Sequence, residues 1–343
     1  MQNEARAGEP VTDPADWRGA ELEQQEGWRQ TFSDAELSDL LRMSRSVRER
    51  IGDDPNRLID VPKDDLDLGC FAPKHAEILE TLTSGAGVAL LRGLPIDEMD
   101  PLDAAIVYWG IGRHMGQAVA NNPDGDLIGH VTDLGKDYRD PNVRGYQTGV
   151  TMDYHCDQSS IVGLLCMETA QSGGTSMVAS SVAIYNAMLA QRPDLVDVLT
   201  ESLYWTKHGE ADPGEAPWYR SPVFNFLDGR LCTSLGPMHI MKGHDLPGAP
   251  ALTVEQREAI DLAAELASDM RYEMTLKKGD IQFANNFTIV HTRDEYVEWP
   301  GRKRLLWRLW LVNDDIRPPT DYALQWRNGA SIAQTQGRIV LGV

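Results

Sequence analysis

The sequence lacks the features that mark membrane, disulfide-rich and nucleotide-binding proteins. None of its apolar runs approaches the roughly 18 residues that a membrane helix needs. It has only 4 cysteines, and none of them stands in a CxxC spacing, so we expect reduced thiols. It contains no GxGxxG motif and no phosphate-binding loop, which makes a doubly wound nucleotide-binding sheet an unlikely fold.

Basic residues are also scarce relative to acidic ones. The chain has 32 Lys and Arg against 52 Asp and Glu, which gives a formal net charge of −20 at pH 7. Such a body repels phosphate backbones and anionic lipid surfaces, so we expect neither nucleic acid nor a membrane as a partner. The first residues contain no apolar stretch typical of a secretory signal, which favours a cytoplasmic location. Self-association into a homo-oligomer is left open.

The composition is that of a soluble globular chain, with 42% hydrophobic and 24% charged residues. We expect residues 1–30 to be an N-terminal tail, its first 16 residues loose, and residues 31–343 to form a single domain. Within the first third, Ser33 and Glu36 form a capping box that predicts a helix through about residue 48. Further expected elements there are helices over 73–83 and 102–114 and a strand over 87–94.

Beyond residue 117 the pattern changes to short apolar or alternating runs separated by turn residues. The expected strands cover residues 162–167, 223–226, 231–233, 274–276, 281–283, 288–291 and 305–312. Two helices interrupt them, over 181–201, broken near Pro193, and over 253–268. The fold class that this order predicts is mainly β with flanking helices, with a sandwich or jelly-roll core.

Among the 8 histidines, the ones most able to bind a metal stand two residues before an acid. Such pairs occur at His75/Glu77, His155/Asp157 and His208/Glu210. On a strand, residues i and i+2 point to the same face and can hold one ion, whereas on a helix they diverge. His75 lies in an expected helix and is interpreted as a surface or core histidine, and His208 lies in a loop-like stretch. His155 and Asp157 precede an expected strand and are the best-placed pair.

Two histidines and one carboxylate on one face of an iron ion form the facial triad of non-heme Fe(II) oxygenases. The third ligand must come from elsewhere in the chain. His291, at the end of the strand over 288–291, is the candidate, and His239 competes with it.

The strand after His291 carries two arginines on one face. With period 2, Arg304 and Arg308 share a face, and the alternate positions are wholly apolar. Arginines that face a core are costly unless anions meet them, and Arg is suited to two-pronged carboxylate binding. The alternative is that both arginines form structural salt bridges.

These stretches together resemble the taurine dioxygenase/clavaminate synthase-like (TauD/TfdA) family of Fe(II)- and 2-oxoglutarate-dependent oxygenases. The resemblance covers roughly residues 80–315 and keeps the order of its motifs. The motifs are His155-Cys-Asp157, Leu164–Met167 with Gly173-Gly-Thr-Ser176, Asn285–His291 and Arg304-Leu-Leu-Trp-Arg308.

The family implies a double-stranded β-helix, or jelly roll, and a role for each matching residue. His155, Asp157 and His291 would ligate Fe(II), and Arg304 would bind the distal carboxylate of 2-oxoglutarate. The cofactors would be Fe(II), 2-oxoglutarate and dioxygen, and the products succinate, CO₂ and a hydroxylated substrate. A threonine often follows the family's Gly-Gly pair by two residues. Here Ser176 holds that position with Thr175 beside it, so either hydroxyl could help to hold the carboxylate.

Arg308 matches a position that often contacts the substrate in this family. Further candidate substrate contacts flank the first ligand pair: Asn121, Arg144, Tyr146 and Gln158. Each of these has a simpler alternative as a turn or packing residue. Cys156, between two expected ligands, should point away from the metal into the core.

Three alternatives stay open beside a hydroxylase of a small acidic or amino-acid-like molecule. Desaturation or ring closure would use the same residues. A jelly-roll hydrolase or isomerase with another metal would leave Arg304 and the Gly-Gly turn without a task. A non-catalytic binding module would be expected to have lost one of the three ligands.

Overall fold

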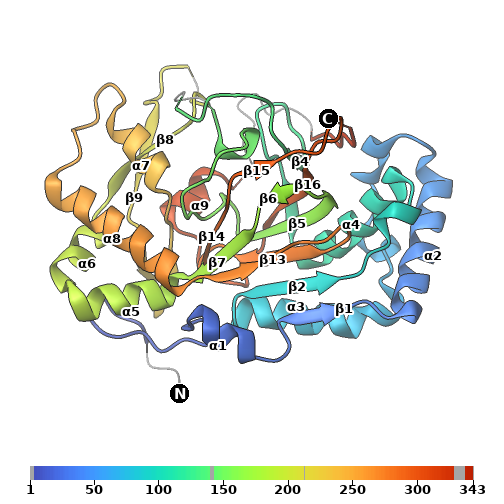
Figure 1. The fold of residues 1–343 in the computed structure, drawn as a ribbon, viewed down its shortest axis with the longest axis horizontal. Coiled ribbons are helices and arrows are strands. Elements are labelled where there is room, and N and C mark those ends of the chain that lie inside the picture. Colours follow the sequence, from blue (N-terminus) through green and yellow to red (C-terminus); the bar gives the residue numbers. More distant parts are fainter. Residues whose placement is uncertain (1–3, 140–142, 212, 328–336, 343) are drawn as a thin grey trace.

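Helices and strands are both prominent in the computed structural model, which describes residues 4–139, 143–211, 213–327 and 337–342 (Figure 1). The helices are α1 (Gly19–Gln24), α2 (Asp34–Ile51), α3 (Ala72–Ser84), α4 (Pro101–Met115), α5 (Ser181–Gln191), α6 (Pro193–Thr200), α7 (Pro237–His244), α8 (Val254–Met270) and α9 (Asp321–Gln325). The strands are β1 (Arg29–Thr31), β2 (Val88–Arg92), β3 (Gln117–Val119), β4 (Ile128–Val131), β5 (Ile161–Glu168), β6 (Ser172–Gly173), β7 (Ser176–Ser180), β8 (Leu203–Thr206), β9 (Trp218–Ser221), β10 (Phe224–Leu227), β11 (Arg230–Thr233), β12 (Tyr272–Met274), β13 (Ile281–Asn285), β14 (Ile289–Arg293), β15 (Tyr296–Val297) and β16 (Leu305–Val312). The chain is therefore a mixed helix-and-strand protein, and the expectation of a mainly β chain understated its helices.

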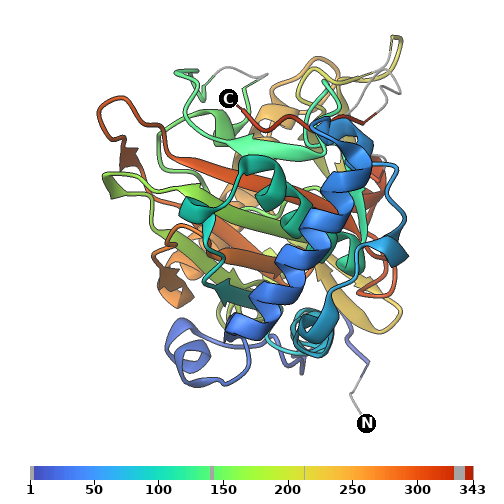
Figure 2. The ribbon, with the colours of Figure 1, turned by 90° about the vertical axis from the view of Figure 1, so that its right-hand side faces the viewer.

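Two sheets form the centre of the molecule. A seven-stranded sheet has the order β1-β2-β13-β5-β16-β3, with β4 also paired to β16, and a three-stranded sheet has the order β12-β7-β14. Helix α4 packs on the large sheet and α2 packs on α4, and Figure 2 looks onto this side, where α2 crosses in front. Helices α5 and α8 cover the small sheet.

The predicted alternation of β16 divides its side chains between two hydrophobic clusters. Trp307, Leu309 and Leu311 join the cluster that contains the residues of α2 and α4. Leu306 and Trp310 join the cluster between the two sheets. Because Arg308 lies on the same face as these last two, its guanidinium enters the space between the sheets, where the candidate site lies.

Local signals in the sequence set most of the element boundaries. The capping box of Ser33 and Glu36 opens α2, with the Ser33 amide 2.7 Å from the Glu36 carboxylate. Pro193 separates α5 from α6. Asp228 and Gly229 both adopt positive φ, 48° and 69°, as the tight turn between β10 and β11 requires. These boundaries confirm the sequence predictions.

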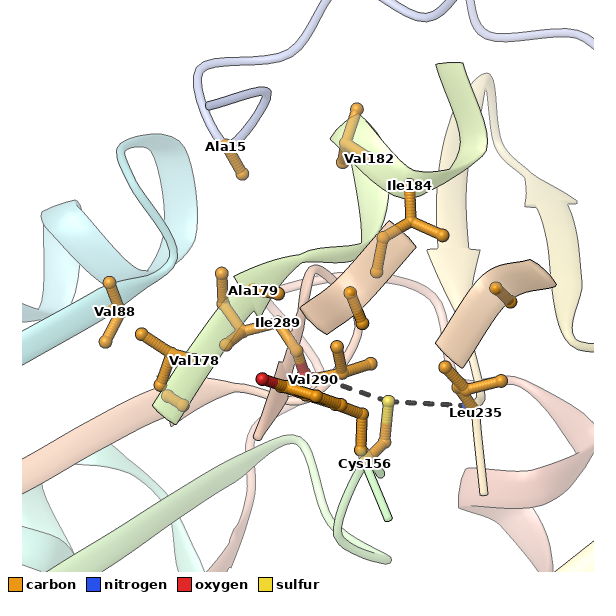
Figure 3. Close-up of a cluster of buried hydrophobic side chains, with 14 of the residues drawn as sticks. Ala15, Val88, Cys156, Val178, Ala179, Val182, Ile184, Leu235, Ile289 and Val290 are labelled. Atoms are coloured by element: carbon orange, nitrogen blue, oxygen red, sulfur yellow. Dashed lines mark hydrogen bonds between the residues drawn. The ribbon is translucent and has the colours of Figure 1, made fainter. Parts of the chain in front are cut away.

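The segment expected to be a loose tail is packed against the body where the structure describes it, from residue 4 onward, and residues 1–3 lie outside the described residues. Val11, Trp17 and Trp28 are buried, and the indole of Trp17 donates a hydrogen bond to the carbonyl of Ala86 at 2.8 Å. Figure 3 shows Ala15 at the edge of the cluster formed by β7, α5 and β14. The prediction failed because it rested on the polar composition of the segment, whereas a few isolated apolar side chains anchor it to the core. None of the helices in the described residues is both long and apolar enough to cross a bilayer.

Candidate metal and cosubstrate site

A pair of backbone hydrogen bonds places the two candidate histidine ligands side by side. The amide of His155 donates to the carbonyl of His291 at 3.0 Å, and the amide of His291 donates to the carbonyl of His155 at 2.9 Å. Residues paired in this way on antiparallel strands project to the same face, and the two imidazole centroids lie 4.5 Å apart. Asp157, two residues further on, joins them and is fixed by a 3.0 Å bond from its amide to Asn286.

The three side chains fit one metal ion. Donor atoms of His155, Asp157 and His291 all lie within 4.8 Å of one another, and this is the only such group of three in the described part of the chain. Nδ1 of His155 lies 2.8 Å from the carbonyl of Asp153. Since a carbonyl only accepts, Nδ1 carries the proton and Nε2 is left as the free ligand atom. Oδ2 of Asp157 has no hydrogen-bond partner within the described residues, as expected of an atom reserved for a cation.

Electrostatics keep Asp157 and His155 in the states that a metal requires. Burial by itself would raise the pKa of Asp157, but the Arg308 guanidinium and then the two imidazoles hold that pKa well below its usual range. Burial, together with His291, lowers the pKa of His155. At neutral pH the site therefore offers a carboxylate and a neutral imidazole.

One small cavity joins the triad to Arg304. Arg304 is 4% exposed and its guanidinium lies 5.0 Å from the ring centre of Tyr296. Nη1 of Arg304 has no hydrogen-bond partner among the residues described. Gly174 packs against the side chain, since a Cβ at this position, with φ of 71°, would come within 3.0 Å of Nε. The cavity thus ends in a buried cation with an unused donor.

The two hydroxyls next to the Gly-Gly pair occupy different places. Ser176 lines the cavity with Arg304, and its hydroxyl donates to Oε1 of Gln282 at 2.6 Å. The described lining of the cavity does not include Thr175, whose carbonyl accepts from the amide of Asp294. Of the two, Ser176 is the one near the expected carboxylate position.

Arg308 is held over the site by two oxygen atoms. Its Nη1 lies 3.1 Å from Oδ1 of Asp157, and its Nε donates to Oδ1 of Asn121 at 2.8 Å. Gly129 opposite leaves the room that Asn121 needs, since a Cβ there would lie 2.7 Å from the Asn121 amide oxygen. Asn121, which was predicted as a substrate contact, accepts this hydrogen bond and so holds the Arg308 guanidinium in position.

The remaining predicted contacts meet in a second chamber next to the triad. Arg144, Tyr146 and Gln158 all line it, and it shares Tyr146, Asp157 and Arg308 with the first cavity. Arg144 donates to Gln158 at 2.8 Å and forms an ion pair with Glu210, whose nearest oxygen is also 2.8 Å away. Tyr146 stacks on Arg308, with its ring centre 4.7 Å from the guanidinium carbon.

Several residues near the site were not found from the sequence. Glu210 was set aside with His208 as a loop pair, although it balances the charge of Arg144 across 66 residues. His239 was named only as a competing ligand, and it lines the second chamber. Arg293 lines the first cavity and donates to the carbonyls of Val150 and Thr148. The sequence did contain a signal for Arg293, because a residue two positions after His291 on a strand points to the same face as His291.

Two interpretations from the sequence are confirmed. His75 is a core histidine, with Nε2 3.0 Å from the carbonyl of Ile111. Cys156 faces the hydrophobic cluster and not the metal site, and Figure 3 shows its sulfur directed toward Leu235 and the carbonyl of Ile289.

The chain as a whole is similar to the proteins of one known family. The profile of the family described as "Taurine catabolism dioxygenase TauD, TfdA family" matches residues 57–310. FR-33289 synthase of Streptomyces rubellomurinus (strain ATCC 31215) is 30% identical over 313 residues, which cover 88% of this chain and 90% of that protein. Taurine hydroxylase-like protein SAT17 of Stachybotrys chartarum (strain CBS 109288 / IBT 7711) is 29% identical over 261 residues, covering 72% of this chain and 66% of that protein.

Solved structures share the fold at low sequence identity. Asparagine oxygenase in complex with Fe(II), 2S,3S-3-hydroxyasparagine and succinate has a TM-score of 0.65 and 16% identity, covering 83% of this chain and 93% of that one. The non-heme iron oxygenase OrfP in complex with Fe and alpha-ketoglutaric acid has a TM-score of 0.60 and 16% identity, covering 91% of this chain and 99% of that one.

Proposed function

Because the chain belongs to the taurine catabolism dioxygenase TauD, TfdA family, we propose that it hydroxylates an unactivated C–H bond of a small acidic or amino-acid-like molecule. It is an Fe(II)- and 2-oxoglutarate-dependent dioxygenase, so dioxygen is consumed and 2-oxoglutarate yields succinate and CO₂. The observation that carries the proposal is one cavity that joins two groups: a His-Asp-His cluster in which Oδ2 of Asp157 has no partner, and a buried arginine whose Nη1 has none, both within the described residues.

Each side chain of this cavity has a distinct task. His155 and His291 would supply neutral nitrogen ligands and Asp157 a charged oxygen, leaving the other positions of the ion open. The bound iron supplies the oxidising chemistry, for which the protein provides binding, orientation and exclusion of water. Arg304 would hold the distal carboxylate of 2-oxoglutarate in a two-pronged pair, with the Ser176 hydroxyl beside it.

The second chamber would hold the primary substrate. Tyr146 and Arg308 line both spaces, so a molecule in the second chamber would lie beside the metal and the cosubstrate. Arg308 would have two tasks there, since it also fixes the orientation of Asp157. Holding a C–H bond next to the reacting centre in this way favours one position of attack.

Two broader proposals accompany this function. The two facing sheets would form the double-stranded β-helix of the family, with the triad at its open end. The four cysteines are free thiols, which supports an enzyme of the reducing cytoplasm.

Succinate formation tests the proposal. Small acids and amino acids would be screened with the iron-loaded protein, 2-oxoglutarate and dioxygen for stimulated succinate release. We expect at least one compound to stimulate release and to gain one oxygen atom by mass spectrometry. A product that has lost two hydrogens instead would indicate desaturation or ring closure, and the absence of any 2-oxoglutarate turnover would refute the proposal.

A further inference from the structure

Two residues that line the second chamber carry hydrogen-bond donors that no described residue uses. Gln158 and Trp310 both line it and are almost fully buried. Arg144 donates to the Gln158 side chain at 2.8 Å. Because a guanidinium can only donate, the amide oxygen must face Arg144 and the NH₂ group is turned away. That NH₂ group and the indole N–H of Trp310 lack partners within the described residues.

The carboxylates in and around the same chamber are already paired. Asp157 is the only carboxylate in the described lining, and it is the proposed metal ligand. Glu210 lies outside the described lining, and both of its carboxylate oxygens accept from Arg144, at 2.8 and 2.9 Å. Asp153 accepts from the hydroxyl of Tyr138 at 2.7 Å. A free ammonium group placed here would therefore meet no carboxylate able to balance its charge.

This imbalance has an energetic consequence for the choice of substrate. A buried donor without a partner is costly, so an acceptor-rich group that reaches Gln158 and Trp310 removes that cost. A buried ammonium without a counter-charge is penalised more heavily. The two arginines that line the chamber, Arg144 and Arg308, are already paired with Glu210 and Asp157, so no carboxylate is left over for a cation.

We infer that the second chamber selects a substrate whose polar end is a compact oxyanion and which carries no free ammonium group. This inference rests on the proposed function and narrows it, because it excludes free amino acids from the acidic and amino-acid-like compounds considered there. Carboxylate, sulfonate and phosphonate heads share the required chemistry. Gln158 and Trp310 act as specificity-determining donors, and the ion pair of Arg144 and Glu210 positions the Gln158 amide.

Matched pairs of small compounds test the inference directly. Butyrate, propanesulfonate and propylphosphonate would each be compared with the ω-amino derivative of the same acid. Binding would be measured by calorimetry under argon on the full chain loaded with Fe(II) and 2-oxoglutarate. For at least one head group, we expect the compound without the amine to bind about tenfold or more tightly than its amino partner. The head group with the largest difference identifies the oxyanion.

Two variants connect this preference to the named donors. Gln158→Glu replaces the free donor with an acceptor of the same shape, so oxyanion binding should weaken about tenfold to a hundredfold and the amino compounds should gain. Trp310→Phe keeps an aromatic ring but removes the N–H, and should weaken oxyanion binding about threefold or more. Gln24→Glu, an exposed change of the same charge on α1, is the matched control and should bind like the unaltered protein.

Equal or tighter binding of all three amino compounds would overturn the inference, as would no saturable binding of any simple acid up to about 10 mM. Unchanged selectivity in both Gln158→Glu and Trp310→Phe would also overturn it. The visible absorption band of the iron and 2-oxoglutarate complex is recorded on the same samples. If that band is present while selectivity fails, this inference alone is wrong, whereas absence of the band from the unaltered protein counts against the proposed function.

Discussion

Arg304 has an unusual position for a single residue, because a guanidinium is buried with one of its nitrogen atoms unpartnered in the described structure. Burial, its largest influence, lowers the pKa of Arg304, so the protein by itself stabilises this cation poorly. Such a residue destabilises the fold unless a ligand anion completes it. A dicarboxylate in the adjoining cavity would do so.

Replacing Arg304 tests this role. Charge-assisted hydrogen bonds contribute about 1.5–3 kcal/mol, so Arg304→Ala should raise the 2-oxoglutarate concentration required for half-saturation about tenfold to a hundredfold. Arg304→Lys should restore binding only in part, because it lacks the planar fork. Arg302→Ala, an exposed neighbour, is the control. An unchanged requirement in Arg304→Ala would return this arginine to a purely structural role.

Single residues also show how far sequence reasoning reaches. His155, Asp157 and His291 could be proposed because strand periodicity and motif spacing are local properties. The support of Arg308 by Asn121 spans 187 residues, and the ion pair of Arg144 with Glu210 spans 66. Partners so distant are determined by packing, which no local pattern records, so Asn121 was assigned to the substrate and Glu210 was set aside.

At the scale of elements, α3 and α4 are joined by a buried histidine. Nε2 of His75 on α3 lies 3.0 Å from the carbonyl of Ile111 on α4, and burial lowers the pKa of His75 to about 4. In the unfolded chain this imidazole would titrate near its ordinary pKa of 6.5. Between pH 6.5 and about 4 the unfolded state binds a proton at His75 that the folded state does not bind. Acid therefore lowers the free energy of unfolding in this range.

The stability of the protein should accordingly fall as the pH drops from about 6.5 to about 4. The contribution of His75 to this loss is about 3 kcal/mol in the free energy of unfolding. His75→Gln keeps a donor for the Ile111 carbonyl but does not titrate. Urea unfolding at several pH values should therefore show a shallower acid slope for the variant. Identical slopes for both proteins would mean that the pKa of His75 is not lowered.

Elements with their own start and stop signals were predictable. The capping boxes at Ser33 and Thr253 and the turn at Asp228-Gly229 need only neighbours in sequence, and the helices and hairpin formed there. Segment 1–30 has no such signals, because its anchors are isolated apolar residues in a polar context. Where the described part of this segment packs on the rest of the protein could therefore be found only from the folded structure.

For the whole molecule, this N-terminal segment closes the core between the two sheets. Trp17 is 1% exposed and contacts a carbonyl in the loop before β2 through its indole. Trp17→Ala should lower the free energy of unfolding by about 3–5 kcal/mol, because removing a large buried side chain leaves a cavity in the core. Trp299→Ala, at a residue that is 36% exposed, should cost less than about 1 kcal/mol. Equal losses in denaturant unfolding of the two variants would show that the segment is not part of the core.

The chain as a whole is acidic, although its interior contains a buried arginine. A formal net charge of −20 makes the chain strongly acidic, whereas Arg304 is a buried cation with no hydrogen-bond partner for its Nη1 in the described residues. An anion such as 2-oxoglutarate would therefore meet its counter-charge inside the molecule.

The central claim is that His155, Asp157 and His291 bind Fe(II) together with 2-oxoglutarate. Its most direct test is an anaerobic titration of the unaltered protein and of His291→Ala with both compounds, followed by visible absorption, with circular dichroism to verify folding. A weak metal-to-ligand charge-transfer band should grow in the unaltered protein and be absent from the folded variant. A band of the same intensity and midpoint in His291→Ala would contradict the claim.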